Sequence, residues 1–225
     1  MITKETAASM IDISDLRTDT TVADIETLIG VAKKYDFVCV FALPCYAQTL
    51  VDTFRDVKTH VGATVGYPSG AEATQIKIAQ TQYLLDVGCD EFDMVLNVGW
   101  LKSKKYKEVG DDIMAVRKML PGNPLKVIIE SMYLEDNEIV EASKIVRDCG
   151  ADYIKSGSGW ASEPTTLRHI EVMKQTLGDS IKIKAAGGVR DLDTLLTMYD
   201  MGVTRFGLGI KSGIAIMDEI DERTK

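Results

Sequence analysis

The stretch FVCVFAL, residues 37–43, is apolar at nearly every position. A strand with one exposed face alternates apolar and polar residues, whereas a strand covered on both faces is apolar throughout. Parallel sheets have both faces covered, because the helices that connect their strands pack on them. This stretch therefore predicts a buried strand in a parallel sheet.

Outward from this stretch, short apolar runs alternate with longer segments of helical periodicity. Eight runs are typical of strands: 8–13, 37–43, 61–67, 91–98, 125–131, 152–156, 181–186 and 204–209. Each precedes a segment whose apolar residues recur every three or four positions, as in an amphipathic helix: 22–34, 45–57, 71–87, 104–119, 134–149, 163–177, 191–201 and 211–221. The mean repeat of about 28 residues is enough for one strand and one helix.

Eight such units predict an α/β protein whose parallel strands close into a (β/α)8 barrel. An open doubly wound sheet is the alternative that this pattern leaves open. No linker, low-complexity tract or block of like charge divides the chain. We therefore expect residues 1–225 to form a single domain.

The composition limits the partners. With 26 basic and 34 acidic residues the net charge is −8, so nucleic acids and anionic membranes repel the chain, and we expect a small-molecule substrate instead.

The four cysteines form no CxxC pair, and the N-terminal residues contain no continuous apolar segment, which predicts a cytoplasmic protein with reduced thiols. Two histidines are too few for a zinc or Ser-His-Asp site, so we expect no metal. A homodimer is expected only because it is the commonest oligomer.

Three charged residues interrupt the predicted strands. Asp93 lies in the fourth strand, Lys155 ends the sixth, and Lys184 lies late in the seventh. Charge inside a barrel is costly unless it is paired or functional, and active sites of such barrels lie at the carboxyl ends of the strands. Lys126 and Lys182 lie at strand starts and are interpreted as lysines whose ammonium groups reach the rim.

Two lysines at the ends of neighbouring strands suggest a specific chemistry. A nearby cation and partial burial both lower the pKa of a lysine from its usual value of about 10.4, and the neutral amine attacks carbonyl groups. The resulting iminium is an electron sink that allows a carbon–carbon bond to break, while an aspartate carries protons. The alternative is that Lys155 and Lys184 only reach the rim and that Asp93 is structural.

Glycines follow the last two strands. Gly187 and Gly188 come directly after the seventh, and GLGIKSG, residues 207–213, follows the eighth. Phosphate sites of such barrels are commonly built here from backbone N–H groups and a helix N-terminus. Lys211 would add a charge and Ser212 a hydrogen bond, whereas the alternative is that these glycines, Gly209 included, only form tight turns.

These motifs together resemble the 2-deoxy-D-ribose-5-phosphate aldolase family, from about residue 8 to 217. TVGYPSGAEATQIK (64–77) resembles the pattern TV-x-(G)-FP-x-G-x-x-T-x-x-K, and DYIKSGSGW (152–160) resembles the segment that carries the Schiff-base lysine. The further similar segments are MIDISDL (10–16), DEFDMVLNVGWLKSKKY (90–106), LKVIIES (125–131) and IKIKAAGGVRDLD (181–193).

The resemblance implies a class I aldolase on a TIM barrel. Such an enzyme cleaves 2-deoxyribose 5-phosphate reversibly to acetaldehyde and glyceraldehyde 3-phosphate, without metal or cofactor. By residue-wise match, Lys155 would be the nucleophile, Lys184 would lower its pKa, and Asp93 would relay protons. Further matched positions would bind phosphate or line the pocket: Gly159, Gly187 and Gly188 for phosphate, and Asp12 and Cys39 for the pocket.

The chain departs from the family pattern at several positions. The usual DHT is Asp12-Ile13-Ser14, KTSTG is KSGSG at 155–159, and CVFALPCY (39–46) is about two residues longer than its counterpart. RFGLGIKSG (205–213) resembles the phosphate stretch with two residues inserted, Lys211 among them. These departures leave two alternatives, a Schiff-base lyase of another phosphorylated or carboxylated sugar and a non-catalytic barrel that binds a phosphometabolite. Trp100 and Trp160 are expected at the barrel mouth.

Overall fold

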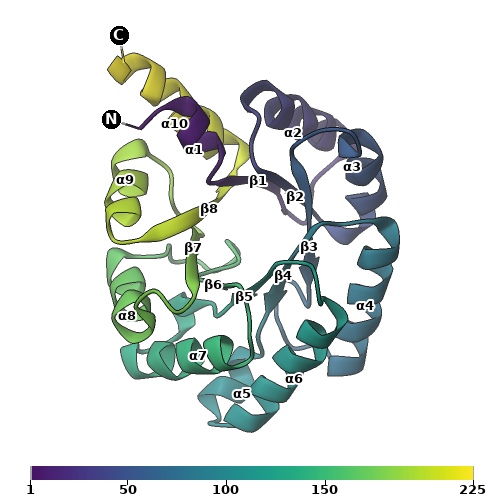
Figure 1. Ribbon diagram of the computed structural model, residues 1–225, viewed down its shortest axis with the longest axis vertical. Helices are drawn as coiled ribbons and strands as arrows, with labels where there is room; N and C mark the ends of the chain where they lie inside the picture. Colours follow the sequence, from purple (N-terminus) through teal and green to yellow (C-terminus); the bar gives the residue numbers. More distant parts are fainter. Residues whose placement is uncertain (1, 225) are drawn as a thin grey trace.

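The computed structural model describes residues 2–224. Its eight strands are parallel, each pairs with its neighbours in chain order, and β1 pairs with β8, so that the sheet closes on itself (Figure 1). The strands are β1 (Ile11–Asp15), β2 (Cys39–Ala42), β3 (His60–Val65), β4 (Glu91–Val95), β5 (Leu125–Ile128), β6 (Tyr153–Lys155), β7 (Lys182–Ala186) and β8 (Val203–Gly209). The predicted (β/α)8 barrel is confirmed, and the open doubly wound sheet is excluded.

Helices form an outer layer around the strands (Figure 1). The main ones are α2 (Val22–Tyr35), α3 (Ala47–Phe54), α4 (Thr74–Val87), α6 (Tyr106–Met119), α7 (Asp136–Asp148), α8 (Leu167–Leu177), α9 (Leu192–Asp200) and α10 (Ile210–Thr224). The short elements are α1 (Lys4–Ala8), α5 (Val98–Lys102) and the 3-10 turns η1 (Pro44–Tyr46) and η2 (Ser131–Tyr133). Every predicted helix is present within a few residues of its expected ends.

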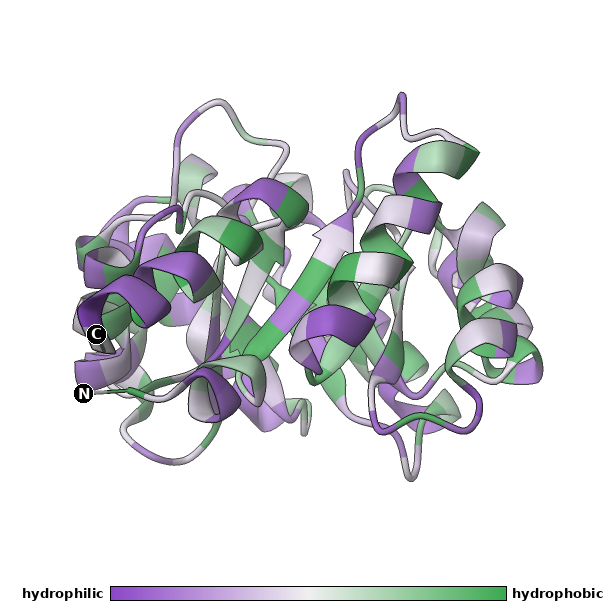
Figure 2. Ribbon diagram, turned by 90° about the horizontal axis from the view of Figure 1, so that it is seen from above, coloured by the Kyte–Doolittle hydropathy of each residue, from purple (hydrophilic) through white to green (hydrophobic). Residues whose placement is uncertain are grey.

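Strand β4 shows how the sequence produces two different surfaces. Its five residues are all buried, with apolar Phe92 and Met94 alternating with acidic Glu91 and Asp93. Successive side chains of a strand point to opposite faces, so one set packs against the helices and the other enters the barrel. In Figure 2 the strand at the centre of the view likewise carries both hydrophobic and hydrophilic residues. The interior of this barrel is therefore charged.

The start of α8 explains why a long loop covers the barrel mouth. Thr166 and His169 form a capping box, in which the threonine hydroxyl accepts a hydrogen bond from the His169 N–H at 3.3 Å. The helix therefore begins at Leu167, four residues later than the predicted start at 163. Residues 156–166, directly after Lys155, remain as a loop.

Three details differ from the sequence-based expectation. Helices α1 and α5 were not predicted, because five residues are too few to show a helical period. The run 91–98 ends as a strand at Val95, since the Asn97 side chain accepts a hydrogen bond from the Trp100 N–H at 3.0 Å and caps α5. The predicted strand 8–13 is shifted, since Ala8 ends α1 and β1 spans Ile11–Asp15, whereas Lys211 lies in the first turn of α10, as the predicted helix 211–221 implies.

None of the described helices is long and apolar enough to cross a bilayer. The four cysteines are all free, with Cys39 and Cys89 buried and Cys45 exposed. The cytoplasmic location and the homodimer stay predictions.

Candidate active site

The barrel interior holds a layer of charged side chains that are at most 7% exposed: Asp12, Glu91, Asp93, Lys126, Lys155, Lys184 and Arg205. The strand register explains why they meet. Lys155 on β6 lies directly beside Lys184 on β7, which in turn lies beside Arg205 on β8. The three residues predicted from the sequence, Asp93, Lys155 and Lys184, are therefore part of a larger set.

Asp93 joins the two lysines that the sequence singled out. Its Oδ2 atom accepts a hydrogen bond from the Nζ atom of Lys155 at 2.7 Å and another from that of Lys184 at 2.7 Å. The two nitrogens therefore lie no further apart than twice that distance. Lys126 donates to the other carboxylate oxygen of Asp93 at 3.1 Å. The predicted proximity of Lys155 and Lys184 is confirmed.

The pKa of Lys155 is lowered to about 8. Burial is the main cause, because a low-dielectric interior disfavours the ammonium form, and the positive charge of Lys184 acts in the same direction. The Asp93 carboxylate opposes both effects. Burial therefore contributes more to the lowered pKa of Lys155 than the second cation does. At pH 7.5 a pKa of about 8 leaves roughly a quarter of the Lys155 amines neutral.

Burial alone would raise the pKa of the Asp93 carboxyl group, but Lys126, Lys155 and Lys184 outweigh it and hold this pKa well below the usual range. Asp93 is therefore a fixed anion between lysines at neutral pH.

A second tier of ion pairs lies next to Asp93. Lys126 contacts Glu91 at 2.6 Å, and Glu91 also accepts a hydrogen bond from Arg205 at 2.8 Å. Arg205 bonds Asp12 at 2.5 Å, and Asp12 lies 2.5 Å from Lys184. The chain of ion pairs from Asp93 through Lys126, Glu91, Arg205 and Asp12 therefore ends at Lys184, which also contacts Asp93.

The charges of this layer do not balance if every group is ionised. Three carboxylates, those of Asp12, Glu91 and Asp93, face four cations, which are Lys126, Lys155, Lys184 and Arg205. Although burial opposes charge on Lys126 and Arg205, the surrounding carboxylates raise the pKa of both. A neutral Lys155 removes the one excess positive charge, which agrees with the direction of its pKa shift.

Lys126 corrects one expectation from the sequence. It was interpreted as a lysine reaching the rim, but it is completely buried and bound to Asp93 and Glu91. Lys182 is exposed as expected, with its Nζ atom 5.3 Å from the centre of the Tyr153 ring. Both lysines lie near strand starts, so sequence position does not distinguish an inward from an outward lysine.

Asp12, Cys39 and Glu91 place one potential ligand atom each within 4.8 Å of one another. The carboxylate oxygens of Asp12 and Glu91 are already paired with Lys184, Arg205 and Lys126. Burial, together with these two carboxylates, raises the pKa of the Cys39 thiol and so disfavours the thiolate that a metal requires. The donor set therefore suits buried ion pairs better than a cation. Asp12 and Cys39 lie beneath the cavity and not in its lining.

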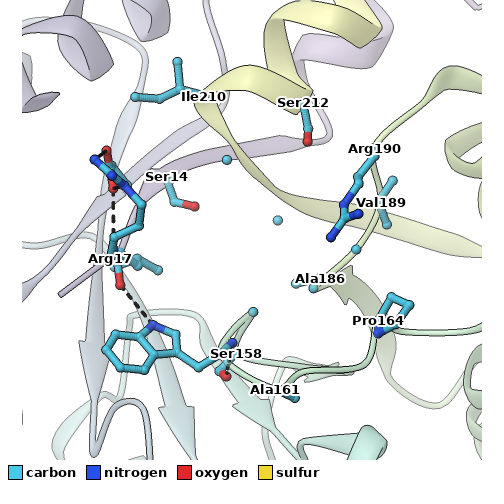
Figure 3. A pocket seen from close by; sticks show the side chains of 18 of the residues that line it. Ser14, Arg17, Ser158, Ala161, Pro164, Ala186, Val189, Arg190, Ile210 and Ser212 are labelled. Carbon is cyan, nitrogen blue, oxygen red and sulfur yellow. Dashed lines mark hydrogen bonds and ion pairs between the residues drawn. The ribbon is translucent and has the colours of Figure 1, made fainter. Parts of the chain in front are cut away.

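A cavity of about 670 Å3 opens at the carboxyl ends of the strands (Figure 3). Lys155 lines it, while Asp93 and Lys184 lie behind Lys155 in the barrel. All the glycines and loop residues predicted for phosphate binding line the same space: Gly159, Gly187, Gly188, Gly209, Lys211 and Ser212. The structure thus brings the amine and the predicted phosphate end into one cavity.

The glycines after β7 are required by the local geometry. Gly187 and Gly188 have φ values of 83° and 107°, which L side chains rarely adopt. A Cβ atom on Gly188 would lie 2.3 Å from the Cβ atom of Pro164. The β7–α9 loop therefore packs directly against the β6–α8 loop.

Two arginines of the cavity were not singled out in the sequence. Figure 3 shows the Arg190 side chain directed into the space, near Ser212. Arg17 is held by Asp15 at 3.1 Å and by Asp24 at 3.3 Å, so its charge is largely compensated. Arg190 lies two positions after Gly188, the second glycine of the pair that follows the seventh strand, and this position was the available sequence signal.

Aromatic side chains form one wall of the cavity. Trp160 and Tyr67 both line it, with their rings edge-to-face and 6.2 Å between centroids. The Trp160 indole N–H donates to the Leu16 carbonyl at 3.0 Å. Trp100, also expected at the mouth, packs against the core from α5 and does not line the cavity.

Comparison with known proteins gives a consistent result. The family described as DeoC/LacD family aldolase matches residues 8–218. The chain is 38% identical to the deoxyribose-phosphate aldolase of Coprothermobacter proteolyticus, over 94% of this chain and 95% of that protein. It is also 38% identical to the deoxyribose-phosphate aldolase of Rhizobium meliloti, over 93% and 85% of the two chains. A solved structure titled "QR15, an Aldolase" superposes with a TM-score of 0.90 at 30% identity, covering 100% of this chain and 98% of that one.

Proposed function

The chain belongs to the DeoC/LacD family of aldolases, and on this premise we propose that it cleaves 2-deoxy-D-ribose 5-phosphate reversibly through an imine on Lys155. The products are acetaldehyde and D-glyceraldehyde 3-phosphate. The observation that carries the proposal is a buried lysine with a pKa of about 8 at the inner end of a cavity lined by glycines and cations. Family membership makes the chain a lyase and disfavours the non-catalytic barrel.

Lys155 would act as the nucleophile. Its neutral amine adds to the C1 carbonyl of the open-chain sugar, and loss of water gives the iminium. The C3 hydroxyl then gives up its proton, the C2–C3 bond breaks, and its electron pair moves toward the iminium nitrogen. Glyceraldehyde 3-phosphate leaves, and the enamine that remains on Lys155 is protonated at C2 and hydrolysed to acetaldehyde.

Asp93 and Lys184 would move the protons. Both lysines donate to the same Asp93 oxygen, so a proton can pass between them without a large movement. The pKa of Asp93 lies well below its usual range, which favours Lys184 as the group that holds the proton between steps. Lys184 also helps to keep Lys155 neutral.

The far end of the cavity would hold the phosphate. Backbone N–H groups of Gly159, Gly187 and Gly188 and the first turn of α10 supply uncharged donors there. The charged and hydroxyl groups that support an anion at this end are Arg190, Lys211 and Ser212. With two cations, the same end also suits another phosphorylated or carboxylated sugar, which is the alternative that the test must separate.

We also infer that the chain is one domain, because the barrel needs both its first and its last strand to close.

Imine trapping tests the mechanism. Acetaldehyde and cyanoborohydride are added to the protein, and intact-mass spectrometry followed by peptide mapping should find one ethyl group on Lys155. Lys155→Met should abolish the adduct, whereas Lys182→Met, which changes an exposed lysine, should leave it in place. An adduct of equal yield in Lys155→Met would refute the assignment. Turnover of 2-deoxyribose 5-phosphate against a panel of other phosphorylated sugars then tests the substrate.

A further inference from the structure

Tyr67 occupies a position in the cavity that the steps above do not use. It lines the cavity together with Lys155, from the loop that follows β3. Its hydroxyl group donates to the Ser158 carbonyl at 2.8 Å, and its ring lies at 87° to that of Trp160. Two contacts with the β6–α8 loop therefore hold both ends of this side chain.

The loop that carries Tyr67 is itself anchored. The Gly66 N–H donates to the Gln80 side chain on α4 at 2.9 Å. Lys77, which is completely buried, donates to the Gly70 carbonyl at 2.8 Å and to Asp112 of α6 at 2.7 Å. The position of Tyr67 is thus fixed before any substrate binds. A group that discriminates between ligands must be preorganised in this way.

The direction of the Tyr67–Ser158 hydrogen bond determines what the hydroxyl can still do. A carbonyl oxygen only accepts, so the phenolic proton is committed to Ser158 and the oxygen can act towards other groups only as an acceptor; the Trp160 side chain lies close enough to engage one of its two lone pairs, which leaves the other. Burial and the carboxylates of Glu130 and Asp93 raise the pKa of Tyr67, so the group stays protonated. Tyr67 is therefore a fixed hydrogen-bond acceptor in the cavity wall.

We propose that the Tyr67 oxygen accepts a hydrogen bond from the C2 hydroxyl of the acceptor aldehyde and so selects 2-hydroxyaldehydes. The inference rests on the proposed function. The acceptor must lie in the cavity between the Lys155 enamine and the phosphate end, and Tyr67 is one of the residues that line this cavity together with Lys155. Glyceraldehyde 3-phosphate has a single free hydroxyl on its skeleton, so the bond has one candidate donor.

The test compares two acceptors in the synthetic direction with acetaldehyde as the donor. One is glyceraldehyde 3-phosphate, and the other is 3-phosphooxypropanal, which lacks the C2 hydroxyl. The wild type should prefer the hydroxylated acceptor about tenfold in kcat/KM, the effect of one neutral hydrogen bond. Tyr67→Phe should reduce this preference to within twofold by losing rate on glyceraldehyde 3-phosphate, with the rate on 3-phosphooxypropanal nearly unchanged.

The matched control is Tyr83→Phe, which removes the hydroxyl of a tyrosine that is 53% exposed on α4. It should keep the wild-type preference. An undiminished preference in Tyr67→Phe, or an equal loss on both acceptors, would overturn the inference and leave the proposed function standing. A wild type that converts neither acceptor and forms no imine on Lys155 would overturn the proposed function, and the inference with it.

Discussion

Replacing Lys184 by methionine should raise the pKa of Lys155 and move the pH dependence of the reaction. Both Nζ atoms lie 2.7 Å from the same Asp93 oxygen, so the two charges are no further apart than twice that distance, a separation on the order of 5 Å. At an effective dielectric constant of about 20 their repulsion is about 3 kcal/mol, which corresponds to a pKa change of about 2. The pKa of Lys155 should therefore rise from about 8 toward 10.

The sign of the effect on rate follows from the neutral amine being the nucleophile. The rate increases as the pH rises through the pKa of Lys155, so the acidic limb of the kcat/KM profile should move to higher pH. At pH 7.5 the neutral fraction should fall roughly 50- to 100-fold. Any role of Lys184 in proton transfer lowers the plateau of the profile as well, but it does not move the limb.

The assay is the kcat/KM profile for cleavage between pH 6 and 10, with circular dichroism at each pH to confirm that the barrel remains folded. Lys182→Met is the matched control, because it removes a lysine from the same strand at an exposed position and should leave the limb near pH 8. A limb that stays near pH 8 in Lys184→Met would refute the electrostatic reasoning. In that case burial alone would account for the pKa of Lys155.

Three further predictions follow from the same network and its surroundings. Because the pKa of Glu91 is lowered from 4.5 to about 2, its contribution of about 3 kcal/mol to the free energy of unfolding should be fully present above pH 4.5 and lost as the pH falls toward 2, as measured by urea unfolding. Lys77→Met leaves the buried Asp112 carboxylate without its cation and should cost about 3–5 kcal/mol in the same assay, with a substantial part recovered when Asp112→Leu is added. Gly188→Ala places a Cβ atom against Pro164 at a φ of 107°, so KM for the phosphorylated sugar should rise severalfold and unfolding should become about 1–3 kcal/mol easier. The Glu91 prediction would be contradicted if the free energy of unfolding did not change between pH 4.5 and 2. The Lys77 prediction would be contradicted if adding Asp112→Leu recovered no stability, and the Gly188 prediction if KM stayed unchanged.

The barrel could be predicted from the sequence because its strands are covered on both sides. Runs such as FVCVFAL differ clearly from the amphipathic segments around them, so the order of elements was readable. Closure was predicted from the number of strand–helix units and not from their periodicity, because it depends on β1 pairing with β8 across nearly the whole chain. Side-chain caps explain two departures from the expected boundaries: Thr166 sets a later start for α8, and Asn97 begins α5 within the predicted strand run 91–98.

The contrast between a charged residue and the apolar strand around it explains which site residues could be predicted from the sequence. Lys155 and Lys184 were visible because they are charges late in apolar strands, close to the expected active-site end. Lys126 and Arg205 lie near the starts of their strands, where a cation usually reaches solvent, so their inward direction could not be read from position. Arg190 and Tyr67 lie in loops, whose conformation has no sequence period.

The ionic layer also limits how the protein can be re-engineered. In an ordinary barrel core, apolar positions can be exchanged one at a time as long as volume is preserved. Here Arg205 is paired with Asp12 and Glu91, and Lys126 is paired with Glu91 and Asp93. A library of single substitutions at these sites would therefore consist mostly of variants with an unpaired buried charge. Useful diversity is expected only when positions on adjacent strands are varied jointly, such as Glu91 with Arg205.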